Sequence, residues 1–228
     1  MAVDPALPDI LPEPARALIA ERAYVALRDR IVTLRLPPGS VLREDELMAE
    51  LGIGRTPLRE AVKRLTLENL VAVRPRRGTF VTDVHPADIA AITEIRAELE
   101  GFAAQLAAER LDDEGRDVAR MLLGAVDTLE REGDQDALMR LDQRVHRLTW
   151  EQSRNAYLLE TLERFFTLSL RIWYVVLDRM PTLRAAVHRQ SQLLEALLAG
   201  DGATARALMH EHVLAFQRDV DHAFAGER

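Results

Sequence analysis

Cysteine is absent from the 228-residue chain, which excludes a disulfide framework, a catalytic thiol and a thiolate-bound zinc ion. Any metal site must therefore use His, Asp, Glu or amide ligands. Aromatic residues make up only 5% of the chain, and every apolar run is broken by Arg, Asp or Glu, which excludes a membrane-spanning helix. The proline-rich residues 1–15 lack the basic start and apolar stretch of a signal peptide. We interpret them as a flexible arm and expect a cytoplasmic protein with no membrane partner.

The residues that dominate are Ala, Leu, Arg and Glu, which favour helices because they lose little conformational freedom on entering one. Hydrophobic residues account for 48% of the chain and charged residues for 29%, the balance of a globular protein rather than a disordered one. The length allows one large domain or two modest ones.

Charge is distributed unevenly along the chain. The net charge is −7, yet residues 1–82 carry 13 basic and 11 acidic side chains, whereas residues 83–228 carry 17 basic and 26 acidic ones. Residues 51–82 alone hold seven basic and two acidic side chains. A basic patch on an acidic molecule indicates a module that binds nucleic-acid phosphate, although a solvated helix face is the alternative interpretation.

This basic stretch coincides with the last of three predicted helices and a hairpin. Apolar residues recur at helical spacing over residues 16–36 and 44–51, and a third helix begins near residue 54, after Gly52. The β-prone runs 70–73 and 79–82 flank a basic turn and predict a hairpin. This order is typical of a winged helix-turn-helix, whose third helix reads the major groove. We expect DNA contacts from Arg43, Arg55, Thr56, Arg59, Lys63, Arg76, Arg77 and Gly78.

The remainder of the chain is predicted to be helical throughout. Apolar periodicity and short breaks place helices at about 86–109, 112–131, 134–152, 155–179, 181–199 and 201–223. Six such helices with short connections form an antiparallel bundle and leave no room for a sheet. The predicted fold is therefore mainly α, with a winged helix-turn-helix at residues 16–83 and an all-helical domain at residues 84–228.

Two sequence runs resemble a known family. LREDELMAELGIGRTPLREAVKRL at residues 42–65 and LVAVRPRRGTFV at residues 70–81 resemble the winged helix-turn-helix of the GntR family of bacterial transcription regulators. The rest resembles the FCD effector domain of the FadR subgroup, in its six-helix, VanR-like form. This resemblance implies a homodimeric regulator, with a repressor as the expected type, that binds a palindromic double-stranded DNA operator. It also implies that the helical domain dimerises and binds a small effector, often an organic acid.

A candidate metal site lies in the helical domain. Asp142 and His146 are four residues apart on one predicted helix, so both side chains project from one face and could share a ligand. In the family, two histidines from the last two helices join such a pair to hold a divalent metal. Aligned on the apolar pattern, those positions fall on His212 and Gln190. The resemblance thus implies zinc or a similar ion on Asp142, His146 and His212, with a poorer amide ligand at Gln190. A metal-free polar pocket formed by these four side chains is the alternative.

A second register, shifted by two residues, would use His188 and His210 instead. Two residues correspond to roughly 200° around a helix, so the two registers face opposite ways. Counting on from Gln190 at helical spacing gives apolar residues, whereas counting on from His188 gives polar ones. We therefore expect His188 and His210 to lie at the surface.

Two arginines are candidates for binding an anionic effector. Arg96 occupies a position at which the family commonly presents an arginine to the cavity, where it could bind a carboxylate through two parallel hydrogen bonds. A pair with Glu100, four residues further along the same helix, is an equal alternative. Arg171 is a weaker candidate of the same kind, and Trp150 is expected in the core or the cavity wall.

The expected function is that of a ligand-responsive transcription regulator and not of an enzyme. A helical metalloenzyme built on the same metal ligands is an alternative, but no carboxylate is evidently placed as a general base, and it leaves the basic hairpin unexplained. A DNA-binding dimer without an effector is the third interpretation.

Overall fold

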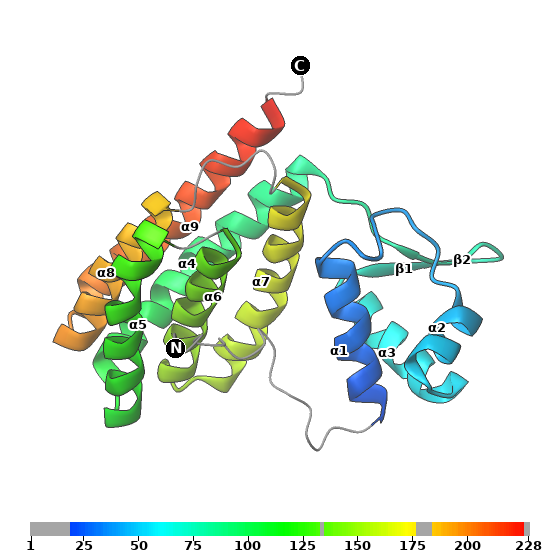
Figure 1. The fold of residues 1–228 in the computed structure, drawn as a ribbon, viewed down its shortest axis with the longest axis horizontal. Coiled ribbons are helices and arrows are strands. Elements are labelled where there is room, and N and C mark those ends of the chain that lie inside the picture. Colours follow the sequence, from blue (N-terminus) through cyan, green and yellow to red (C-terminus); the bar gives the residue numbers. More distant parts are fainter. Residues whose placement is uncertain (1–18, 133–134, 177–183, 226–228) are drawn as a thin grey trace. The chain divides into compact units, whose positions relative to one another are not determined.

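The computed structural model describes residues 19–132, 135–176 and 184–225 (Figure 1). They cluster into two compact units. The winged unit contains the described residues up to His85 together with Thr167–Val175, and the helical unit contains Pro86–Phe166 and the described residues from Val176 onward. The arm predicted at residues 1–15 lies outside the described residues.

Residues 19–81 form three helices and a two-stranded antiparallel hairpin, which confirms the predicted winged helix-turn-helix. Gly52 ends the second helix in the left-handed conformation, with φ 63°, and its N–H bonds to the Met48 carbonyl. The first helix ends at Val32 rather than near residue 36, because Leu34 has a φ of 60° and breaks the helical path. The elements are α1 (Ile19–Val32), α2 (Glu44–Leu51), α3 (Arg55–Leu67), β1 (Val71–Arg74) and β2 (Gly78–Val81).

One apolar core joins these elements. Leu27 of α1, Leu58 and Leu65 of α3, and Leu70 before β1 are all fully buried in it. The buried side chains of α3 recur every three or four residues, so they occupy one face of the helix. The opposite face of α3 is therefore left to its polar and basic side chains.

Tyr24 of α1 contacts polar side chains at the C-terminal end of α3. Its hydroxyl donates to the Glu68 carboxylate, with 2.8 Å to Oε2, and the Arg64 guanidinium carbon lies 3.6 Å from the ring centroid. Burial raises the pKa of Tyr24 to about 12, and the negative charge and hydrogen bond of Glu68 act in the same direction, against the opposing effect of Arg28 and Arg64.

This arrangement predicts a loss of stability at alkaline pH. A folded-state pKa above the unfolded value of about 10 means that the folded protein holds the phenolic proton more tightly. The contribution of Tyr24 is therefore complete below about pH 10 and is lost as the pH rises towards 12. The free energy of unfolding of the wild type, measured with urea, should fall between these pH values. In Tyr24→Phe it should fall less; an equal fall would contradict the role of this hydroxyl.

The helical unit is built on α4. This helix packs along α9 and also contacts α6 and α8, while α5 lies against α6 and α8 (Figure 1). The mainly α fold is thus confirmed, and β1 and β2 are the only strands among the described residues. No described helix combines the length and apolar character needed to cross a membrane. The elements of the unit are α4 (Pro86–Arg110), α5 (Asp113–Glu132), α6 (Gln135–Gln152), the first part of α7 (Ala156–Val176), α8 (Arg184–Ala199) and α9 (Gly202–Ala225).

Glycines let α4 and α9 approach closely. A Cβ atom at Gly101 of α4 would lie 3.2 Å from the Arg206 carbonyl oxygen, and one at Gly202 of α9 would lie 3.2 Å from the Gln105 carbonyl oxygen. Both distances are tighter than ordinary van der Waals contact. This close packing holds α9 against α4.

Candidate functional site

The predicted DNA-reading side chains of α3 share its exposed face. Arg55, Thr56, Arg59 and Lys63 are exposed, and Arg43, which precedes α2, is exposed as well. Gly54 provides no side-chain cap, so backbone N–H groups at the start of α3 are left for another acceptor. Backbone N–H groups and arginines at a helix N-terminus form a ready anion-binding surface.

Acidic residues of α2 lie beside these arginines. Arg55 Nη2 is 3.7 Å from Asp45 Oδ1, and Arg59 Nε is 3.7 Å from Glu44 Oε2. Sequence reasoning missed these pairs, because the acidic first turn of α2 is equally explained by the helix dipole. Exposed ion pairs of this kind contribute little to stability, so a DNA phosphate can displace them.

The hairpin presents the remaining basic side chains. Arg76, Arg77 and Gly78 are all exposed. The turn closes with a 3.0 Å bond from the Arg77 N–H to the Arg74 carbonyl, and Arg76 takes a left-handed φ of 62°. Arg64 differs from the other arginines of α3, because its Nη1 lies only 2.6 Å from Glu21 Oε2. This close ion pair makes it less available to bind phosphate.

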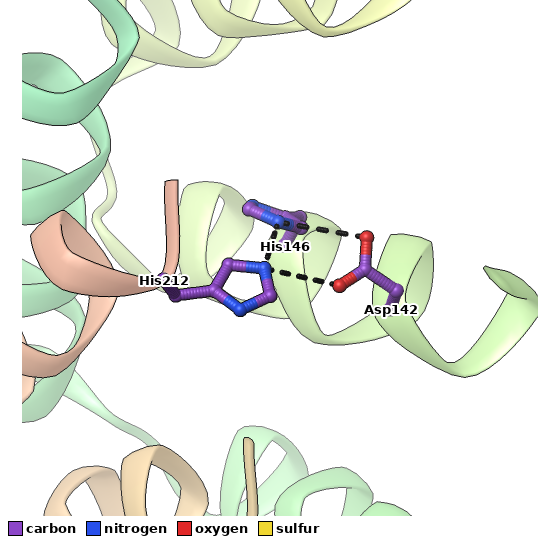
Figure 2. A group of neighbouring side chains, drawn as sticks. All are labelled: Asp142, His146 and His212. Atoms are coloured by element: carbon purple, nitrogen blue, oxygen red, sulfur yellow. Dashed lines mark hydrogen bonds and ion pairs between the residues drawn. The ribbon is translucent and has the colours of Figure 1, made fainter. Parts of the chain in front are cut away.

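Asp142, His146 and His212 converge inside the helical unit (Figure 2). His146 Nε2 lies 3.2 Å from His212 Nε2, and Asp142 Oδ1 lies 3.1 Å from His212 Nε2. The two histidines are 1% and 8% exposed. Side chains from α6 and α9, 66 positions apart in the sequence, therefore form a single cluster.

The donor atoms of this cluster fit a divalent ion. Two nitrogens that bind one zinc ion at about 2.0–2.1 Å, at a tetrahedral angle, lie about 3.3 Å apart. The separations between His212 Nε2 and its two neighbours, 3.1 and 3.2 Å, match this value. Asp142 Oδ2 and His146 Nε2 are 3.7 Å apart, slightly wider. Two imidazoles and a carboxylate also leave a fourth position for another ligand.

Gln190 of α8 lies beside Asp142, as the sequence alignment predicts. Its amide nitrogen donates to Asp142 Oδ1, and the side chain is buried. Its amide oxygen is buried and has no hydrogen-bond partner among the described residues. Gln190 therefore holds the carboxylate of Asp142, while its oxygen is a further polar atom for a bound ion or effector.

Glu100 of α4 lies behind His146 and was not predicted as a site residue. Its Oε2 accepts a 3.0 Å hydrogen bond from Trp150 Nε1 and faces His146 Nδ1. Its Oε1 accepts a 2.9 Å hydrogen bond from Arg96 Nε and a second from Nη2. Of these contacts, the sequence indicated only the pair with Arg96, through its four-residue spacing from Glu100.

Both carboxylates stay ionised despite their surroundings. Burial alone would raise the pKa of Glu100, but the charges of His146 and Arg96 and their hydrogen bonds hold it well below its usual range. The pKa of Asp142 is also lowered, because His146, His212 and Arg96 outweigh the effect of burial. Two ionised carboxylates beside a single arginine form a setting in which a bound cation is electrostatically favoured.

The two arginines predicted for effector binding belong to different units. Arg96 lies beside the cluster, paired with Glu100, and its guanidinium carbon lies 5.0 Å from the Phe166 ring centroid. Arg171 is buried in the winged unit, where Nη1 donates to Thr82 Oγ1 at 2.8 Å. Burial lowers the pKa of Arg171 to about 10, against the opposing charge of Asp83.

Of the two histidines of the rejected register, the structure describes the side chain of His210, which lies outside this cluster. His210 Nε2 lies 3.4 Å from Glu98 Oε1, at the partly exposed side of α9. The side chain of His188 lies outside the described residues.

Two protein families match the chain. The family described as "Bacterial regulatory proteins, gntR family" matches residues 19–81, which span the winged helix-turn-helix. The family described as "FCD domain" matches residues 91–215, which include Glu100 and all three members of the His–Asp cluster.

Curated relatives and solved structures agree with these matches. An uncharacterized HTH-type transcriptional regulator of Streptomyces ambofaciens is 31% identical over 210 residues, covering 87% of this chain and 83% of the relative. The transcriptional repressor GlaR of Escherichia coli K12 is 31% identical over 213 residues, covering 89% and 96%. The structure of E. coli McbR/YncC shares the fold, with a TM-score of 0.78, 23% identity, and coverage of 92% and 99%. The chain therefore belongs to the GntR family of bacterial transcription regulators, with an FCD domain after its winged helix-turn-helix, and is not an enzyme.

Proposed function

We propose that this regulator is a cytoplasmic repressor that binds a palindromic operator as a homodimer and that a divalent metal and a small organic acid adjust its DNA affinity. The observation that carries the proposal is the convergence of Asp142, His146 and His212 in a chain whose α3 exposes a basic face. Two such reading helices, spaced about one helical turn of DNA apart, would fit successive major grooves.

The metal and the effector would bind in the helical unit. Zinc or a similar ion would be held by Asp142, His146 and His212, and the open fourth position suits a carboxylate. Glu100 engages Nε and Nη2 of Arg96, so an effector that contacts this arginine would use Nη1. The ion would supply positive charge for the effector, and the surrounding side chains would orient it.

The proposal is tested by thermodynamic linkage. An operator is first selected from random duplex DNA with the full-length protein, and we expect a palindrome. Operator affinity is then measured with and without zinc and a panel of small carboxylates. Zinc affinity is measured in turn with and without the operator. The factor by which zinc changes the affinity for the operator must equal the factor by which the operator changes the affinity for zinc.

Salt dependence and thermal stability complete the test. Operator affinity should fall linearly with salt on logarithmic axes, with a slope of about −0.9 for each phosphate contacted. Ligands that bind only the folded protein should raise its melting temperature. Operator binding without any stabilisation by zinc or carboxylates would instead identify a DNA-binding dimer without an effector, and two unequal linkage factors would contradict the proposed mechanism.

A further inference from the structure

Glu100 lies behind the His–Asp cluster and is more completely buried than Asp142, the carboxylate within it. Its exposure is 0%, and it accepts hydrogen bonds from two nitrogens of Arg96 on one carboxylate oxygen. The other oxygen accepts from Trp150 Nε1 and faces His146 Nδ1. Arginine and tryptophan nitrogens act only as donors, so this carboxylate acts as an acceptor on both oxygens.

This setting determines which nitrogen of His146 carries the proton. A ring nitrogen that hydrogen-bonds to an accepting carboxylate must be the protonated one, and Asp142 Oδ2, at 3.7 Å from Nε2, is too far away to impose this on Nε2. The proton of neutral His146 therefore lies on Nδ1, and the lone pair lies on Nε2. Nε2 is the atom that faces His212, at 3.2 Å, and Asp142.

The rings around His146 limit its other orientations. The Phe166 ring centroid is 5.0 Å from that of His146, and the Trp150 centroid is 5.8 Å away. These rings restrict the imidazole plane, but they do not select between the two tautomers, which requires a polar partner. Among the described side chains, Glu100 supplies the partner for Nδ1.

We propose that Glu100 is a positioning residue that fixes His146 in the Nδ1–H tautomer and directs Nε2 towards Asp142 and His212. The inference about metal affinity rests on the proposed function, whereas the tautomer does not. A carboxylate that accepts from the outer nitrogen of a metal-binding histidine orients the ring and makes it a more basic ligand. Glu100 would act on the ion through His146, without touching it.

Replacement of Glu100 tests this role. In Glu100→Gln, one amide must face both the donors of Arg96 and the Nδ1 side of His146. With its oxygen towards Arg96, its NH2 group donates to Nδ1 and places the ring proton on Nε2, which weakens metal binding because the ring must change tautomer before Nε2 can bind the ion. We expect zinc affinity, measured by competition with a chromophoric chelator, to fall about 10- to 100-fold. Glu100→Asp keeps the charge but draws back from the ring and should also bind more weakly.

Two control variants separate positioning from general destabilisation. Arg96→Met disturbs the same buried ion pair but leaves Glu100 against His146, so it should lose less zinc affinity than Glu100→Gln. Glu98→Gln changes an exposed carboxylate of the same helix and should bind zinc as the wild type does. Wild-type affinity in a folded Glu100→Gln, or an equal loss in Arg96→Met, would overturn the proposal.

The tautomer is measured directly in the metal-free protein. The 15N shifts of protonated and unprotonated imidazole nitrogens differ widely, and His146→Gln assigns the resonances. We expect an Nδ1–H signal for His146 in the wild type; an Nε2–H signal would overturn the proposal even if Glu100→Gln does not fold. A wild type that binds no zinc would remove the proposed metal and leave this measurement to decide the role of Glu100.

Discussion

A His212→Ala variant should bind zinc at least about 100-fold more weakly than the wild type. Loss of a group behind a metal ligand already costs about 10- to 100-fold, and His212 would contact the ion itself. Its Nε2 is the atom shared by the two short separations of the cluster. His146 would keep its contact with Glu100, and Asp142 its contact with Gln190, so the remaining cluster should stay ordered. Chelator competition measures the affinity.

His210→Ala provides a matched control on the same helix. His210 is two residues from His212 but contacts Glu98, so its loss should leave zinc affinity unchanged. Removal of metal by a chelator should lower the melting temperature of the wild type and of His210→Ala, but not of His212→Ala. With zinc at 100 times its Kd, binding adds about 2.7 kcal/mol to the free energy of unfolding. Equal zinc affinity in His212→Ala and the wild type would refute the proposed ligand set.

The fold was largely predictable because helical periodicity is a local property. Leu58, Ala61, Val62 and Leu65 recur at helical spacing, and all four are buried as one face of α3. The family resemblance and the apolar pattern likewise placed His212 beside Asp142, although α6 and α9 are far apart in the sequence. In the second case the family resemblance implied the contact between the two helices, and the apolar spacing along α9 selected His212 rather than His210.

Other features depended on partners that no local pattern specifies. Glu100 meets His146 and Trp150 of another helix, so its sequence neighbourhood indicated only a pair with Arg96. Arg64 counted towards the basic stretch, but its guanidinium packs on Tyr24. Arg171 was placed with the effector by resemblance, yet it binds Thr82. The charge of these side chains is visible in the sequence, but tertiary packing determines what each one contacts.

Arg59→Ala should weaken operator binding about 5- to 150-fold, the equivalent of about 1–3 kcal/mol. The Arg59 side chain is 66% exposed on the reading face of α3, and its nearest acidic partner, Glu44 at 3.7 Å, holds it weakly. The substitution should not unfold the winged unit, because Leu58 and Leu65 form the buried face of the same helix. Fluorescence anisotropy with the selected operator measures the loss.

The pattern of the loss would show what Arg59 contacts. If it reads a base edge, single base changes at one operator position should lose their effect in Arg59→Ala; if it binds a phosphate, all sequences should weaken together and the salt slope should fall by about one. Arg120→Ala removes the same charge from a side chain that is 62% exposed and paired with Asp117, but on α5. It should leave operator affinity unchanged, since net charge alone is not the cause. Wild-type affinity in Arg59→Ala would exclude this residue from the DNA contact and shift the reading role to Arg55 and Lys63.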